Sequence, residues 1–145
     1  MFMGQYNHNL DAKGRLIVPA RLREPLGEHA FVTKGLDGCL FVYTEGDWKV
    51  FEEKLGKLPI TSPDARQFAR FFLAGAADCE FDKQGRILIP QVLRDYADLK
   101  KEVVLVGVAS RIEIWSQERW DEREAAYNQN MDEVAVNLGN LGFSI

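Results

Sequence analysis

An internal repeat is the feature of this sequence that most limits how the chain can fold. The segment Asp11-Ala-Lys-Gly-Arg-Leu-Ile-Val-Pro-Ala-Arg-Leu-Arg-Glu24 returns 71 residues later as Asp82-Lys-Gln-Gly-Arg-Ile-Leu-Ile-Pro-Gln-Val-Leu-Arg-Asp95. Asp, Gly, Arg, Pro, Leu and Arg recur unchanged, and four further positions change only within a chemical class. A repeat with a shared special turn indicates one supersecondary unit used twice, so we expect an internal pseudo-two-fold axis.

Each copy predicts the same order of elements: strand, turn, strand, short helix, two further strands and a longer helix. Asp at the first turn position and Gly at the fourth are typical of a type I turn closed by a left-handed glycine, and this predicts a tight hairpin in each copy. The predicted ranges are strands 6–10, 15–18, 30–34 and 40–43 in the first copy and strands 79–81, 86–89, 102–106 and 112–115 in the second, with short helices through Leu22 and over 92–97.

Polar residues mark where the longer helices begin. Thr44 and Ser116 are predicted N-caps of helices that carry Trp48 and Trp120 at matching positions. Ser62 followed by Pro63 predicts a further helix over 64–73, with Phe68, Phe71 and Phe72 on its apolar side. The last helix is predicted to end near Val136.

Length favours two halves that share a single core. A repeat of roughly 55 residues would be only marginally stable alone, whereas 145 residues bury a substantial core. The tail is rich in Gly and Asn but also holds Leu and Phe, so a mobile tail is favoured and a docking arm for another subunit is the alternative. The predicted divisions are 1–56 as the first repeat, 57–75 as linker and connecting helix, 76–136 as the second repeat and 137–145 as a flexible tail.

The net charge of −4 does not exclude a nucleic-acid partner, because the charge is unevenly distributed. Residues 116–145 carry six acidic residues and two arginines, so the rest of the chain is balanced and the two repeated turns are locally basic. Local sign governs steering at a contact surface more than the overall sum does. No apolar stretch is long enough for a membrane helix and no secretory signal is visible, so we expect a cytoplasmic protein without a membrane partner. If the partner is DNA, the protein is also expected to be nucleoid-associated.

The repeated turns carry the candidate DNA-binding residues. Arg15 and Arg86 follow the glycine, where Asp11 and Asp82 can accept from both the turn and the guanidinium. A guanidinium held in this way has the geometry to read guanine in the major groove. The simpler interpretation, a salt bridge that only holds the turn, is compatible with this role. Further contacts, mainly to phosphates, are predicted for Lys13 and Lys83, with Arg21, Arg23 and Arg94 as a secondary set.

These motifs, together with Met1-Phe-Met-Gly4, resemble the MraZ family of bacterial transcriptional regulators, which belongs to the AbrB-like, swapped-hairpin class of DNA-binding proteins. The resemblance implies an α+β fold in which two repeats form a pseudo-two-fold double swapped-hairpin β-barrel with flanking helices. It also implies ring-like homo-oligomers, binding to double-stranded promoter DNA at direct repeats near a cell-division and cell-wall gene cluster, and DNA contacts by Asp11, Arg15, Asp82 and Arg86. One departure is that Gln84 occupies the position of Lys13, which predicts different phosphate contacts at the second turn.

Other classes of function are less well supported. An oligomeric protein-interaction scaffold without DNA binding is the main alternative. Asp78, Glu80 and Asp82 could share one strand face, but they lack the pattern of a calcium loop, so neither a metal site nor an enzyme is predicted. No cofactor and no small-molecule substrate are expected, and Cys39 and Cys79 are expected to be reduced and buried.

Overall fold

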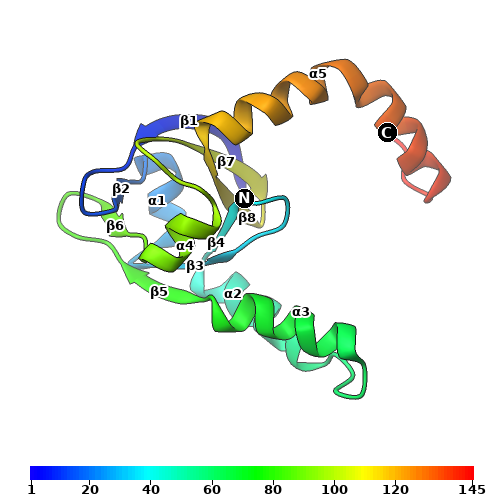
Figure 1. Ribbon diagram of the computed structural model, residues 1–145, viewed down its shortest axis with the longest axis horizontal. Helices are drawn as coiled ribbons and strands as arrows, with labels where there is room; N and C mark the ends of the chain where they lie inside the picture. The colour runs from blue at the N-terminus through cyan, green and yellow to red at the C-terminus, as the bar shows by residue number, and fades with distance from the viewer.

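Eight strands and five helices follow one another in the order that the repeat predicts (Figure 1). The computed structural model describes all 145 residues. The elements are β1 (Phe2–Asn9), β2 (Arg15–Ile17), α1 (Ala20–Leu26), β3 (His29–Lys34), β4 (Leu40–Tyr43), α2 (Glu45–Gly56), α3 (Pro63–Ala74), β5 (Ala77–Glu80), β6 (Arg86–Leu88), α4 (Gln91–Tyr96), β7 (Glu102–Ala109), β8 (Arg111–Ser116) and α5 (Gln117–Asn140).

The strands form two antiparallel groups, and the α+β class is confirmed. Six strands form a sheet in the order β1-β7-β8-β4-β3-β5, and β2 and β6 form a separate two-stranded sheet. The counterparts in the two repeats are β1 and β5, β3 and β7, and β4 and β8. Exchange of each strand for its counterpart reverses the sheet order and leaves it otherwise unchanged, as a pseudo-two-fold axis requires. The strand pairing leaves the sheet open between β1 and β5, so it does not make one closed barrel.

The predicted local hairpins at the two repeated turns are wrong in their pairing. Only a single bridge between Leu10 and Leu16 joins the β1 and β2 sides, and β5 pairs with β3 rather than with β6. Instead β2 pairs with β6, so that Leu16 lies opposite Ile87. Both side chains are almost fully buried. This exchange brings the apolar residues of the two short strands into one core, which neither hairpin could enclose alone.

That core is shared by both repeats, as the length predicted. A cluster of 19 buried residues includes Val18 and Leu22 from the first repeat and Ile89 and Leu93 from the second. A second cluster of nine residues lies where the helices cover the sheet and contains Trp48, Phe72, Trp115 and Trp120. The two free cysteines are buried, and burial raises the pKa of the Cys79 thiol to about 11.

The predicted helix starts are confirmed by their capping bonds. The hydroxyl oxygens of Thr44, Ser62 and Ser116 accept from the backbone N–H three residues on, at 3.0, 3.2 and 3.1 Å. None of the five helices has the length and apolarity that crossing a membrane requires.

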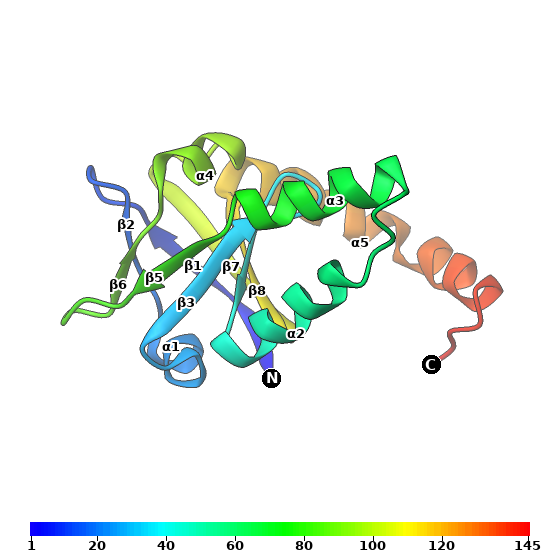
Figure 2. The same cartoon turned by 90° about the horizontal axis from the view of Figure 1, so that it is seen from below.

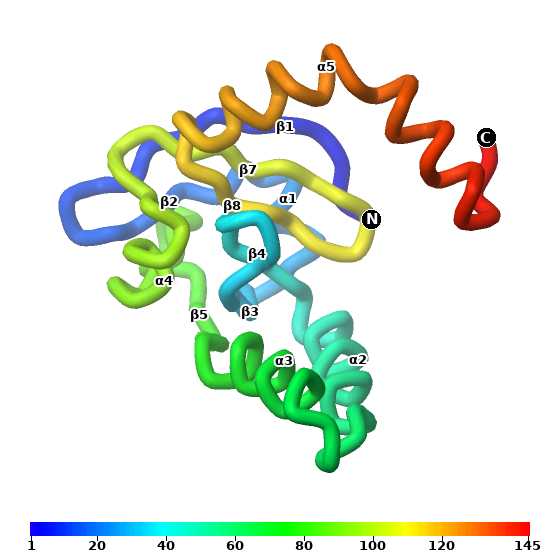
Figure 3. The backbone as a smooth tube through the Cα atoms, turned by 45° about the vertical axis from the view of Figure 1, so that its right-hand side comes forward, coloured from blue at the N-terminus to red at the C-terminus, as the bar shows by residue number.

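Two helical parts extend away from the sheets. The helices α2 and α3 lie side by side and project from the body as a pair, and α5 projects from the body in a different direction (Figure 3). The helix α5 continues to Asn140, four residues beyond its predicted end near Val136, and includes Asn137 and Gly139. A single glycine costs a helix only about 1 kcal/mol, so it does not have to end the helix. Beyond Glu124 every residue is exposed.

Candidate nucleic-acid interface

The two repeated turns lie at the same end of the molecule. We call residues 11–15, which lead from β1 into the first residue of β2, the first tip, and residues 82–86, which lead from β5 into the first residue of β6, the second tip. Both tips project on the side opposite to the C-terminal half of α5 and to the α2–α3 pair (Figures 1 and 2). The pairing of β2 with β6 brings them together, because each tip leads directly into one of these strands.

The first tip is organised around the carboxylate of Asp11. Its Oδ1 accepts from the backbone N–H groups of Lys13 and Arg15, both at 2.9 Å. Its Oδ2 accepts from Arg15 Nε at 2.6 Å. One side chain therefore fixes the turn and orients the guanidinium, as the sequence predicted.

The second tip repeats this arrangement and adds two contacts. Asp82 Oδ1 accepts from the N–H groups of Gln84 and Arg86 at 2.9 Å, and Asp82 Oδ2 accepts from Arg86 Nε at 2.7 Å. In addition, Arg86 Nη2 donates to Gln84 Oε1 at 2.7 Å. Arg86 Nη1 lies 3.9 Å from Asp11 Oδ2, so the second arginine reaches across to the carboxylate of the first tip.

Backbone bonds lock the two tips to each other across the pseudo-two-fold axis. Val18 N–H donates to the carbonyl of Gly85 at 3.1 Å, and Ile89 N–H donates to the carbonyl of Gly14 at 3.0 Å. Both glycines have a positive φ, 84° at Gly14 and 76° at Gly85, in the left-handed region predicted for the turn.

Each glycine also makes room for an arginine of the other repeat. A Cβ at Gly14 would lie 2.5 Å from Arg94 Cζ, and a Cβ at Gly85 would lie even closer to the guanidinium of Arg23. Arg23 Nη1 donates to the Val18 carbonyl at 2.8 Å, and Arg94 Nε donates to the Ile89 carbonyl at 2.8 Å. Sequence reasoning missed this exchange. The only sequence feature that could have indicated it is the recurrence of this glycine and this arginine in both copies of the repeat.

The surrounding donors keep both tip carboxylates ionised. The backbone N–H of Arg15 holds the pKa of Asp11 below its ordinary value, and the Arg15 guanidinium adds to this effect. The backbone N–H of Arg86 lowers the pKa of Asp82 for the same reason, again with help from its guanidinium. A charge-assisted bond at neutral pH therefore holds each arginine in place.

The remaining basic residues of the predicted site differ in the exposure and hydrogen bonding of their side chains. Lys13, Lys83 and Arg21 are exposed and make no hydrogen bond or ion pair through their side chains. Arg23 and Arg94 are half-buried and already bonded to backbone carbonyls. The structure thus brings Arg15 and Arg86 together in one surface and places Arg23 and Arg94 beneath the tips.

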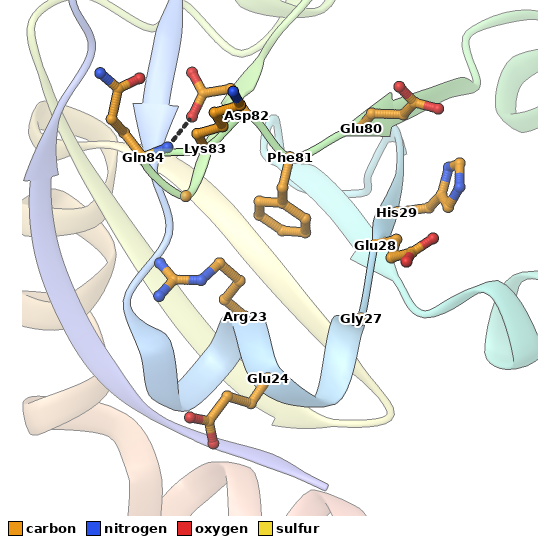
Figure 4. A pocket seen from close by; sticks show the side chains of 11 residues that line it. Arg23, Glu24, Gly27, Glu28, His29, Glu80, Phe81, Asp82, Lys83 and Gln84 are labelled. Atoms are coloured by element: carbon orange, nitrogen blue, oxygen red, sulfur yellow. Dashed lines mark hydrogen bonds between the residues drawn. The ribbon is translucent and has the colours of Figure 1, made fainter.

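A pocket of about 640 Å³ lies beside the second tip (Figure 4). Arg23 and Glu24 of α1 line one wall, the second tip lines the other, and Phe81 lies between them. Near its edge, His29 Nδ1 lies 2.7 Å from Asp78 Oδ1, and this contact raises the pKa of His29. No group of three or more potential metal-ligating side chains is arranged to hold a metal ion.

Comparison with known proteins agrees with the internal repeat. A family described as "MraZ protein, putative antitoxin-like" matches residues 1–71 and, a second time, residues 72–137. The chain is 57% identical to the transcriptional regulator MraZ of Desulforamulus reducens over 141 residues, 97% of this chain and 99% of that protein. It is 59% identical to the transcriptional regulator MraZ of Desulfitobacterium hafniense strain Y51, over 98% of this chain and 99% of that protein. The protein of the same name from Carboxydothermus hydrogenoformans is 60% identical over 89% of this chain and 93% of its own length.

Proposed function

The chain belongs to the MraZ family of transcriptional regulators, and we propose that it acts by binding double-stranded DNA through its two tips. The observation that supports this most is the convergence of two arginines on one carboxylate. Asp11 Oδ2 accepts from Arg15 at 2.6 Å and lies 3.9 Å from Arg86. Two oriented guanidinium groups therefore lie next to each other at an exposed end of the molecule.

The chemistry of these groups suits a DNA groove. A guanidinium with free terminal nitrogens donates two parallel hydrogen bonds to O6 and N7 of guanine, which is worth about 1–3 kcal/mol of base discrimination. Lys13, Lys83 and Arg21 are free to contact phosphates, which positions the protein without specifying a sequence. Arg23 and Arg94 contribute mainly by supporting the tips, and their uncommitted nitrogens are available to nearby phosphates.

Self-association is the second part of the proposal. One pair of tips offers few contacts and binds weakly at physiological salt, whereas linked tips that match spaced sites gain roughly 10²–10⁴ in avidity. The exposed half of α5 presents Met131, Val134 and Leu138 at helical spacing, and the exposed Leu141 follows directly after its last residue. Most helical stability in proteins comes from the packing of an apolar face, which this exposed half lacks, so contact with another copy would stabilise it.

The family membership supports the finer details. The two repeats together would make one swapped-hairpin, barrel-like unit, several copies would form a ring, and the ring would bind direct repeats in the promoter of a cell-division and cell-wall gene cluster. Such a protein works in the cytoplasm at the nucleoid.

Single and double arginine variants test the proposal. We expect Arg15→Ala to weaken binding to a preferred promoter duplex by about 1–3 kcal/mol, and Arg15→Ala with Arg86→Ala to abolish discrimination from random DNA. Arg70→Ala on α3 is the matched control, because this arginine is exposed and distant from the tips. Binding is measured at two salt concentrations with oligomer size and circular dichroism in parallel. Unchanged affinity in a folded double variant would contradict DNA contact by these residues and favour the scaffold alternative.

A further inference from the structure

The two tips share one geometry but differ in the residue before the glycine. The first tip has Lys13 at this position, and its side chain makes no bond to Arg15. The second tip has Gln84, whose Oε1 accepts from Arg86 Nη2 at 2.7 Å. A cation cannot accept this bond, so the exchange of Lys for Gln gives only the second arginine a neighbouring acceptor.

The consequence is a different degree of freedom for the two guanidinium groups. Arg86 has all three nitrogens engaged or facing an acceptor: Nε with Asp82, Nη2 with Gln84 and Nη1 facing Asp11. Arg15 is bonded through Nε alone, which leaves Nη1 and Nη2 without a partner in the chain. The exposed fraction of the side chain agrees with this difference, at 33% for Arg15 and 23% for Arg86.

We propose that the two tips bind DNA in different ways: Arg15 contacts a base, and Arg86 is a positioning residue that Gln84 holds against Asp11. This inference rests on the proposed function. Bidentate contact with guanine needs two terminal N–H groups, and Arg15 offers them without rearrangement. In Arg86 one N–H of Nη2 is committed to Gln84 and Nη1 faces Asp11, so this fork is held in place and offers fewer free donors than that of Arg15. In its observed place it instead adds positive charge beside the carboxylate that orients Arg15.

A double-mutant cycle separates positioning from independent contact. We expect Gln84→Ala to weaken binding to the preferred duplex by roughly three- to tenfold, the usual worth of one hydrogen bond. In the Arg15→Ala background the same change should cost less than about twofold, because Arg86 acts through Asp11 on Arg15. Gln67→Ala, an exposed glutamine on α3, is the matched control and should have no effect in either background.

Exchange of the two residues gives a second, independent readout. Gln84→Lys removes the acceptor and adds a cation, so the salt dependence of binding should steepen by about 0.9 while discrimination from random DNA falls. Lys13→Gln should provide Arg15 with an acceptor and reduce discrimination at the guanine it contacts. If only the salt dependence changes in Lys13→Gln, the neighbouring residue does not control the arginine and the inference is wrong.

The cycle also distinguishes failure of the inference from failure of the proposed function. Equal losses from Gln84→Ala in both backgrounds would show that the second tip reads DNA independently, which overturns the inference while DNA binding stands. Binding that is unaffected by Arg15→Ala and by salt would overturn the proposed function itself.

Discussion

The two repeats are closely similar at the tip end of this molecule and differ at its helical end. At the tip end the aspartate makes the same hydrogen bonds in both copies. Its bonds to the backbone of the arginine are 2.9 Å long, and its bonds to the arginine side chain are 2.6 and 2.7 Å long. At the helical end the copies differ, because the first continues into the 12-residue helices α2 and α3 and the second into the 24-residue α5. The difference shows where the repeats are bound to each other and where they are independent.

Mutual contact explains the likeness of the tips. Gly14 accommodates Arg94, and Gly85 accommodates Arg23, so a larger side chain at a glycine of one repeat would displace an arginine of the other. At the helical end only the start of the helix is shared, through an N-cap and a buried tryptophan in each copy. Beyond these positions α2 and α5 leave the body in different directions, and each half carries its own extension (Figure 3). Four predictions test this division, from the largest expected effect to the smallest.

Removal of residues 128–145 should have the largest effect, and it should act on assembly rather than on the tips. These residues are exposed and contribute nothing to the buried core, so the remaining chain should fold. We expect a smaller particle in sedimentation and a loss of about 10²–10⁴ in affinity for spaced sites, with binding to a single site unchanged. An unchanged number of subunits per particle would assign self-association to another surface, and the α2–α3 pair would be the next part to test.

Substitution of a tip glycine should destabilise the fold itself. In Gly14→Ala the positive φ is strained and the new Cβ displaces Arg94, so we expect the free energy of unfolding to fall by about 1–3 kcal/mol. Gly85→Ala should behave alike through Arg23. Urea unfolding measures both. Gly46→Ala in α2 is the control and should be neutral or slightly stabilising. If Arg94→Ala does not relieve part of the cost of Gly14→Ala, the cross-repeat contact is not its source.

Loss of the helix caps should cost less and should not reach the tips. Thr44→Ala and Ser116→Ala each remove one capping bond, for which we expect about 1 kcal/mol of unfolding free energy. Thermal unfolding checks the cost, with the exposed Ser110→Ala as control. DNA affinity of the folded variants should stay at the wild-type level. A large loss of affinity would instead show that the helical end controls the tips.

Acid should produce the smallest effect, through the two tip carboxylates. Because the pKa values of Asp11 and Asp82 are lowered in the folded state, their contribution to stability is complete above the unfolded value of about 3.9. It is lost as the pH falls through the lowered folded values. The contribution of the two tip carboxylates to the unfolding free energy should therefore be flat from pH 5 to 7 and decline below about pH 4. The raised pKa of His29 adds a separate, opposite trend, because its contribution is complete below about pH 6.5 and is lost as the pH rises through the raised folded value. The decline should be shallower in Asp11→Asn, and an identical pH profile in this variant would contradict the assignment.

Local chemistry explains which parts of the fold were predictable. Asp11 contacts residues two and four positions away, so a pattern of five residues contains the whole of the turn and its arginine. The caps at Thr44, Ser62 and Ser116 are equally local and were predicted correctly. The end of α5 was not, because Asn137 and Gly139 are typical of a loop in short-range patterns although the helix continues through them.

Long-range pairing was beyond the sequence pattern. The strands β2 and β6 have three residues each, too few to show a period that selects a partner 71 positions away. The local pattern therefore predicted two separate hairpins, whereas β2 pairs with β6 in the structure, and only the family resemblance implied an exchange between the repeats. The roles of Arg23 and Arg94 depend on the same exchange, because each one packs on the glycine of the other repeat.

The sequence by itself determined that one unit occurs twice and that each copy ends in an aspartate-ordered turn with an arginine, because these features depend on neighbours within a few positions. Only the tertiary structure decided that the two turns lie side by side and that Arg86 reaches Asp11. The physical reason is that burial of Leu16 against Ile87, which sets this arrangement, is a contact between segments that no local pattern connects.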